Sequence, residues 1–156
     1  MQAKPGVLDF LNQILTIELT VINQYFLQAE MCRNWGYEGL YKKIMALARG
    51  EMDDAQGLIR HILYLEGIPN MQRLNTVNVG ENVLENMQID LEGEKFAVST
   101  LVEAIGHCAE VGDFTTRGML EQMIRDEEEH VDWFETQLET IRQLGIEHFL
   151  AHHIRE

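Results

Sequence analysis

The chain has 156 residues, of which 46% are hydrophobic and 24% charged, and these values are typical of one globular domain. Twelve Lys and Arg against 26 Asp and Glu give a formal net charge of -14. This charge argues against partners such as nucleic acid or anionic membranes, because both need basic surfaces. No apolar run is long enough to span a bilayer, and the first residues do not resemble an export signal. We therefore expect a soluble, cytoplasmic, single-domain protein.

Apolar residues recur at helical spacing along most of the chain and predict an all-α fold. The first stripe consists of Leu8, Leu11, Leu15, Leu19, Ile22, Phe26 and Ala29. Gly67 and Pro69 predict the end of the second helix, Gly112 that of the third, and Asp113 a cap for the fourth. The expected helices cover residues 7–35, 38–66, 83–111 and 113–144, with a short helix over 146–154.

The helices are expected to form two pairs. Tight turns join the members of each pair, whereas residues 70–82 lack helical periodicity and are interpreted as an extended connection between the pairs. Four helices with one long crossover are typical of one class of four-helix bundle. The sequence therefore predicts a four-helix bundle with a short C-terminal helix.

Four glutamates interrupt the apolar stripes, one on each long helix: Glu18, Glu51, Glu94 and Glu127. A single Glu on a helix is usually solvated, and burying an ionised carboxylate without a partner costs several kcal/mol. Four of them facing one another in a core would need a cation between them. The pattern therefore favours a metal site over four solvated side chains.

The spacing of these residues supports the same interpretation. Glu18 and Glu51 are 33 residues apart, as are Glu94 and Glu127. Glu127 and His130 lie one turn apart on one helical face. One Glu from each of two helices, with Glu-x-x-His motifs from the others, is the di-iron carboxylate arrangement, and these donors suit iron.

Several segments combine with these residues into one family pattern: Ile22-Asn23-Gln24-Tyr25-Phe26, Asn34-Trp35-Gly36, Ile62-Leu63-Tyr64-Leu65-Glu66-Gly67-Ile68-Pro69-Asn70 and Arg125-Asp126-Glu127-Glu128-Glu129-His130-Val131-Asp132-Trp133. In them the sequence resembles bacterioferritin, the haem-containing branch of the ferritin family, over essentially the whole chain. The resemblance implies a ferritin-like bundle that assembles into a cage of two dozen subunits, oxidises ferrous iron and stores it as a ferric mineral core.

The resemblance also implies the ligands of a dinuclear iron centre: Glu18, Glu51, Asp54, Glu94, Glu127 and His130. At one of them the sequence departs from the family, whose second helix reads Glu-Met-x-His where this chain reads Glu51-Met52-Asp53-Asp54. Asp is shorter than His and adds negative charge to four carboxylates. We therefore expect a weakened oxidation centre.

Met52 keeps the family pattern. It lies about 100° around the helix from Glu51, so it is expected to point away from the bundle interior. By resemblance, Met52 and its counterpart across a twofold axis bind the iron of haem b through their thioethers. Without the resemblance, a Met at helical spacing would be taken as a core residue.

Three functions remain open from the sequence. The first is a haem-binding subunit that works in a mixed cage with a second, ferroxidase-active bacterioferritin subunit, with a small ferredoxin as redox partner for iron release. The second is a homomeric ferroxidase that uses Asp54 as a ligand. The third, a small rubrerythrin-like oxidoreductase, is disfavoured because the sequence has no Cys-pair iron site. His148, His152 and His153 cluster in the tail, where a metal site and plain surface exposure are both possible.

Overall fold

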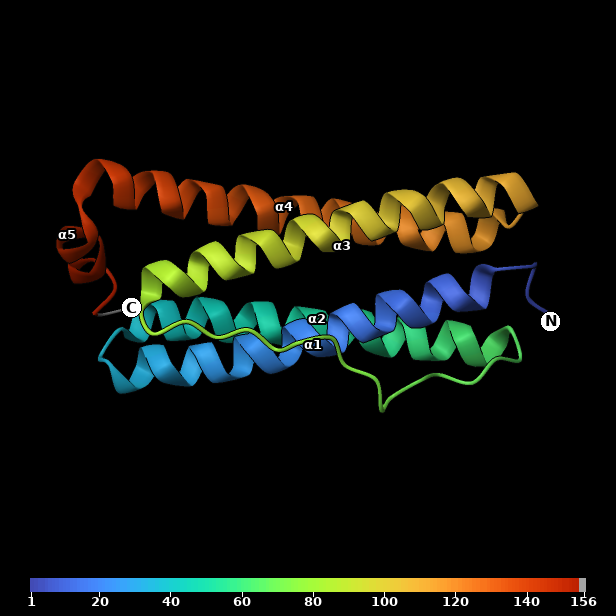
Figure 1. Ribbon diagram of the computed structural model, residues 1–156, viewed down its shortest axis with the longest axis horizontal. Coiled ribbons are helices and arrows are strands. Elements are labelled where there is room, and N and C mark those ends of the chain that lie inside the picture. Colours follow the sequence, from blue (N-terminus) through green and yellow to red (C-terminus); the bar gives the residue numbers. More distant parts are fainter. Residues whose placement is uncertain (155–156) are drawn as a thin grey trace.

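The structure, a computed structural model, describes residues 1–154 and confirms the predicted all-α bundle. Helices α1 (Val7–Asn34) and α2 (Glu38–Tyr64) form one antiparallel pair, and α3 (Val83–Val111) and α4 (Phe114–Leu144) form the other (Figure 1). The short helix α5 (Ile146–Ala151) packs against α4 at one end of the bundle. No helix in the described part of the chain is long and apolar enough to cross a membrane.

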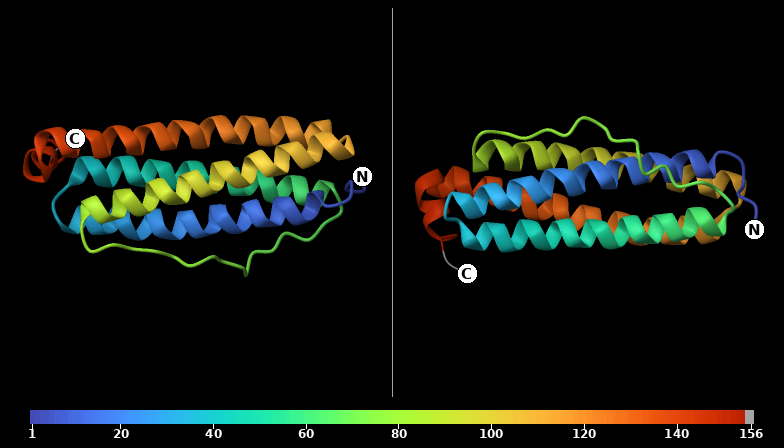
Figure 2. Two further views of the ribbon diagram at one scale, coloured as in Figure 1. Left: turned by 45° about the horizontal axis from the view of Figure 1, so that its top comes forward. Right: turned by 90° about the horizontal axis from the view of Figure 1, so that it is seen from below.

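The crossover between the pairs runs along the length of the bundle (Figure 2). Side chains of α1 and α3 accept hydrogen bonds from backbone amides of the crossover and hold it in place. The acceptors on α1 are Asn12, Thr20 and Gln24, which bind the amides of Asn70, Asn75 and Asn78 respectively. The acceptor on α3 is Asn86, which binds the amide of Gly80. These bonds satisfy backbone donors of a segment that makes no ladder of its own. The crossover runs from the last residues of α2, at one end of the bundle, to the start of α3 at the opposite end.

Local sequence explains where the helices begin and end. Asn82 and Asp113 cap α3 and α4, because their side chains accept hydrogen bonds from the amides of Glu85 and Thr116. Gly112 and Gly145 have positive φ angles just beyond α3 and α4, in backbone conformations that favour glycine.

The residue that ends α2 in a left-handed conformation is not the expected glycine. Gly67 was predicted as the glycine that stops the helix, but α2 ends at Tyr64 and the left-handed residue is Glu66, with a φ of 63°. Gly67 is needed for another reason. A Cβ atom there would lie 2.5 Å from a methyl group of Leu8, so glycine allows the turn to pack against α1.

The apolar stripe of α1 is also shifted from the predicted one. Phe26 was expected in the core but is 38% exposed, and Leu19 and Ile22 are only partly buried. The fully buried face of α1 instead runs through positions that include Ile14, Tyr25 and Cys32. The predicted stripe followed the largest apolar residues, whereas the bundle buries the face that also carries polar side chains.

The core is divided into two apolar clusters. One, nearer α5, contains residues such as Tyr25, Ile44 and Phe134, and the other, nearer the N-terminus, contains residues such as Leu11, Leu58 and Leu120. On α2 and α4, Glu51 and Glu127 lie between residues of the two clusters, and on α1 and α3, Glu18 and Glu94 lie near the boundary between them. The fold therefore leaves a polar layer across the middle of an otherwise apolar core.

Candidate metal centre

The four predicted glutamates lie in this polar layer. Glu18, Glu51, Glu94 and Glu127 are each only 1% exposed, and they come from α1, α2, α3 and α4 respectively. Each helix supplies one carboxylate because each has one Glu in its buried stripe at the same height of the bundle. The residues that interrupt the apolar pattern are thus the ones that the fold brings together.

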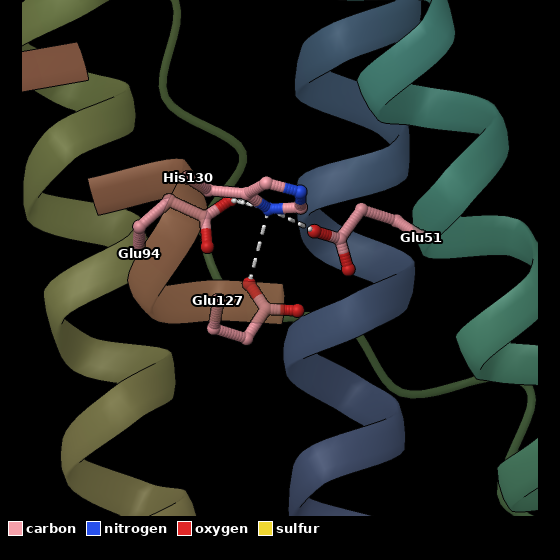
Figure 3. Close-up of side chains that lie close together, drawn as sticks. All are labelled: Glu51, Glu94, Glu127 and His130. Atoms are coloured by element: carbon pink, nitrogen blue, oxygen red, sulfur yellow. Dashed lines mark ion pairs between the residues drawn. The ribbon is translucent and has the colours of Figure 1, made fainter. Parts of the chain in front are cut away.

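His130 completes one group of possible ligands (Figure 3). Its Nδ1 atom lies 3.1 Å from a carboxylate oxygen of Glu51 and 3.5 Å from oxygens of Glu94 and Glu127. The four potential ligand atoms all lie within 4.8 Å of one another. Nδ1 makes no hydrogen bond of acceptable geometry with any of these three oxygens. A cation at this point would satisfy all four groups at once.

Glu18 and Asp54 belong to a second, overlapping group. Their carboxylate oxygens lie within 4.8 Å of one another and of oxygens of Glu51 and Glu127. Glu51 and Glu127 are therefore common to both groups, as expected of ligands that bridge two metal ions. The structure thus places all six residues singled out in the sequence within these two groups.

Without a cation, protons compensate for the crowded negative charge. Burial and the nearby Glu51 raise the pKa of Glu18 well above its usual value. Burial and a hydrogen bond with Glu94 raise the pKa of Glu127 to about 11. Burial alone would lower the pKa of His130, but its contacts with Glu127, Glu51 and Glu94 outweigh burial and raise the pKa to about 12. The metal-free site therefore holds several protons that cations would displace.

Several carboxylate oxygens of the four buried glutamates have no hydrogen-bond partner. They are Oε2 of Glu18, both oxygens of Glu51, Oε2 of Glu94 and Oε1 of Glu127. Leaving buried polar oxygens unpartnered is costly, and buried carboxylates in proteins are normally hydrogen-bonded, paired or bound to metals. Carboxylate oxygen with one imidazole nitrogen is a donor set that iron accepts. The residues present therefore fit a pair of iron ions.

Asp54 differs from the four glutamates in its surroundings. It is only partly buried, and burial together with the charges of Glu51 and Asp126 raises the pKa of its carboxyl to about 7. The Asp54 carboxyl is therefore divided between its protonated and ionised forms near neutral pH. Asp126 directly precedes Glu127 in the sequence and was not among the expected site residues.

A second buried polar group lies next to the centre, and the sequence did not lead us to expect its acidic member, Asp90. The hydroxyl of Tyr25 donates a hydrogen bond to Glu94, and Asp90, one turn before Glu94 on α3, is 1% exposed. Burial raises the pKa of Asp90 well above its usual value, although contacts with Gln28 and Gln24 oppose this shift. The four-residue spacing of Asp90 and Glu94 places both on one face of α3, and this spacing could have indicated that Asp90 is buried beside the centre.

The remaining predicted residues lie outside the centre. Met52 directly follows Glu51 yet is 45% exposed, so its side chain lies on the outer surface of α2 whereas that of Glu51 is buried. In the tail, His148 and His152 are exposed and His153 is partly buried. Within residues 1–154, these three histidines do not form a metal-binding group with one another.

Comparisons with known proteins agree with this geometry. The ferritin-like domain family matches residues 8–144. The chain is 43% identical to a bacterioferritin of Mycolicibacterium paratuberculosis over 97% of this chain and 95% of that protein. It is 40% identical to one of Rhodobacter capsulatus and 36% identical to one of Brucella melitensis, in each case over 96% of this chain and 92% of the relative. The chain therefore belongs to the ferritin-like domain family and, within it, to the bacterioferritins.

Proposed function

We propose that this member of an iron-storage family is a cytoplasmic, haem-carrying subunit of a bacterioferritin cage, with a dinuclear iron centre weakened by Asp54. In this proposal the cage contains two dozen subunits and a ferric mineral core. A second bacterioferritin subunit supplies fast ferrous oxidation, and a small ferredoxin delivers electrons for iron release. The observation that carries the proposal is the contrast on α2 between the buried Glu51, the exposed Met52 and the partly buried Asp54.

The buried carboxylates support iron as the cargo of this site. Four nearly inaccessible glutamates and His130 converge from four helices, and their unpartnered oxygens would otherwise destabilise the core. The net charge of -14 also favours the approach of cations to the subunit.

The position of Asp54 supports a weakened centre. Its carboxyl must lose a proton before it can bind a cation, and a pKa of about 7 makes that loss incomplete near neutral pH. When it is ionised, it stands close to Glu51 and Asp126, and repulsion among these carboxylates opposes a compact ligand set. Passing two electrons to dioxygen requires both irons together, so loss of one metal position should slow oxidation strongly.

The exposure of Met52 supports haem binding at a contact between subunits. Its thioether is accessible on the outside of the α1–α2 pair, and Phe26 of α1 is also exposed. A thioether that faces away from its own bundle can bind haem iron together with a ligand from another chain. Haem bound between two copies through both Met52 side chains would bury this apolar surface.

One observation favours a second candidate, a homomeric ferroxidase. An oxygen of Asp54 lies within 4.8 Å of oxygens of Glu18, Glu51 and Glu127, so Asp54 reaches the centre despite its short side chain. If it is a working ligand, the cage needs no second type of subunit.

Stopped-flow oxidation distinguishes the two candidates. The metal-free protein is loaded with two ferrous ions per subunit and mixed with dioxygen, and the ferric absorbance is followed. We expect the wild type to oxidise iron slowly and Asp54→His to oxidise it at least about tenfold faster, because a neutral imidazole removes the extra negative charge and needs no proton loss from a carboxyl. A fast wild-type phase that saturates at two irons per subunit would instead establish the homomeric ferroxidase.

A further inference from the structure

The two groups of ligands differ in their donor atoms. The group of Glu51, Glu94, Glu127 and His130 contains one nitrogen, and we call it the histidine half. The group of Glu18, Glu51, Asp54 and Glu127 contains only carboxylate oxygens, and we call it the aspartate half. Glu51 and Glu127 belong to both groups. The difference in donor atoms therefore arises from the ligands that are not shared, Glu94 and His130 in one half and Glu18 and Asp54 in the other. The centre is therefore chemically asymmetric.

The charges of the ligands do not match two divalent ions. The five carboxylates carry a charge of -5 when all are ionised, whereas two ferrous ions carry +4. One ferrous and one ferric ion together carry +5. Four of the carboxylates are 1% exposed, so solvent screens an unbalanced charge only weakly. Removal of one electron from an iron pair would make the centre neutral.

The donor atoms determine which half would hold the more highly charged ion. Hard, highly charged cations prefer oxygen ligands, and imidazole suits ferrous iron. Four carboxylates surround the aspartate half, against three carboxylates and one imidazole in the histidine half. Charge and donor type therefore select the same half for the ferric ion.

We propose that the centre stabilises iron as a ferric–ferrous pair, with the ferric ion in the aspartate half and the ferrous ion in the histidine half. The proposal rests on the dinuclear centre proposed above and assigns an unequal role to its two positions. The pair forms when one of two ferrous ions loses one electron to a one-electron oxidant. The second ferrous ion then resists oxidation, because its loss of an electron would leave the neutral centre with an excess positive charge.

The experiment uses the full-length, metal-free protein in its assembled form. Two ferrous ions per subunit are bound without oxygen, and bound iron is counted after removal of free metal. Ferricyanide, which becomes ferrocyanide as it takes one electron, is then added stepwise. Low-temperature electron paramagnetic resonance measures the half-integer spin of a coupled ferric–ferrous pair. We expect this signal to rise to nearly one spin per subunit at one equivalent and to fall when more oxidant is added.

Two variants connect the signal to the charge of Asp54. Asp54→Asn keeps the size of the side chain and one oxygen donor but removes the charge, and we expect it to reduce the maximum signal at least about tenfold. Asp53→Asn removes an exposed carboxylate from the same turn of α2 and should leave the signal unchanged.

The outcomes separate this proposal from the one on which it rests. If two ferrous ions bind but the wild type gives no more coupled signal than Asp54→Asn, the ferric–ferrous assignment is wrong while the dinuclear centre stands. If fewer than two ferrous ions bind per subunit, the dinuclear centre is wrong, and this assignment falls with it.

Discussion

At the scale of single residues, four consecutive positions of α2 carry two proposed metal ligands, Glu51 and Asp54, and the proposed haem ligand Met52. Glu51 points into the core and Met52 points outward, whereas the partly buried Asp54 lies next to the buried glutamates. A helix rotates by about 100° per residue, so neighbours diverge while residues three apart lie on nearby faces. A change at Met52 is therefore expected to leave the carboxylates undisturbed.

Met52→Leu tests the haem assignment. Leu has nearly the volume of Met but no thioether, so we expect loss of haem with normal cage assembly. The absorbance of purified protein measures haem per subunit, and size-exclusion chromatography measures assembly. Met71→Leu changes another exposed methionine, on the crossover, and should retain haem. Equal haem content in both variants would refute ligation by Met52.

The raised pKa of Asp54 predicts a pH dependence of stability. Burial and nearby carboxylates raise this pKa from 3.8 to about 7, so the folded chain binds the proton more tightly than the unfolded chain. The resulting stabilisation is complete below about pH 4 and is lost as the pH rises through 7. Urea denaturation of metal-free protein should show Asp54→Asn gaining stability relative to the wild type between these pH values. A difference that is constant with pH would contradict the shift.

At the scale of helices, the periodicity of the sequence was enough to predict the bundle. The buried glutamates were predictable too, because a charged residue inside an apolar stripe needs a compensating partner. Other features depend on tertiary packing, which a single helix does not reveal. The shift of the α1 stripe away from Phe26, the contact of Gly67 with Leu8, and the burial of Asp90 are of this kind.

The cap of α4 provides a prediction at this scale. Asp113 is 5% exposed and accepts hydrogen bonds from both the amide and the hydroxyl of Thr116, whose hydroxyl also contacts His61 of α2. Asp113→Ala should therefore lower the free energy of unfolding by about 1–3 kcal/mol, because buried partners are left unsatisfied. The exposed cap Asn82 accepts one such bond, and Asn82→Ala should cost about 1 kcal/mol. Chemical denaturation measures both, and the reverse order would contradict the role of the buried network.

At the scale of the whole molecule, the carboxylates give the subunit a function beyond its own centre. With 26 acidic against 12 basic residues, each subunit contributes a strongly negative surface to a cage. Such a surface raises the local concentration of cations, whatever the rate at which this subunit oxidises them. In the proposed mixed cage, this subunit would therefore attract iron even where its own centre oxidises it slowly.

Co-expression tests this division of labour. The partner should be a bacterioferritin chain that keeps Glu-x-x-His in its second helix, because it retains the ligand that Asp54 replaces here. We expect native mass spectrometry to detect cages that contain both chains. These cages should oxidise ferrous iron faster than the homomer, since the partner keeps His at the position where this chain has Asp54. They should also bind haem through Met52, so Met52→Leu in this chain should lower their haem content without slowing oxidation. Purely homomeric cages from co-expressed chains would argue against a mixed assembly and in favour of Asp54 as a working ligand.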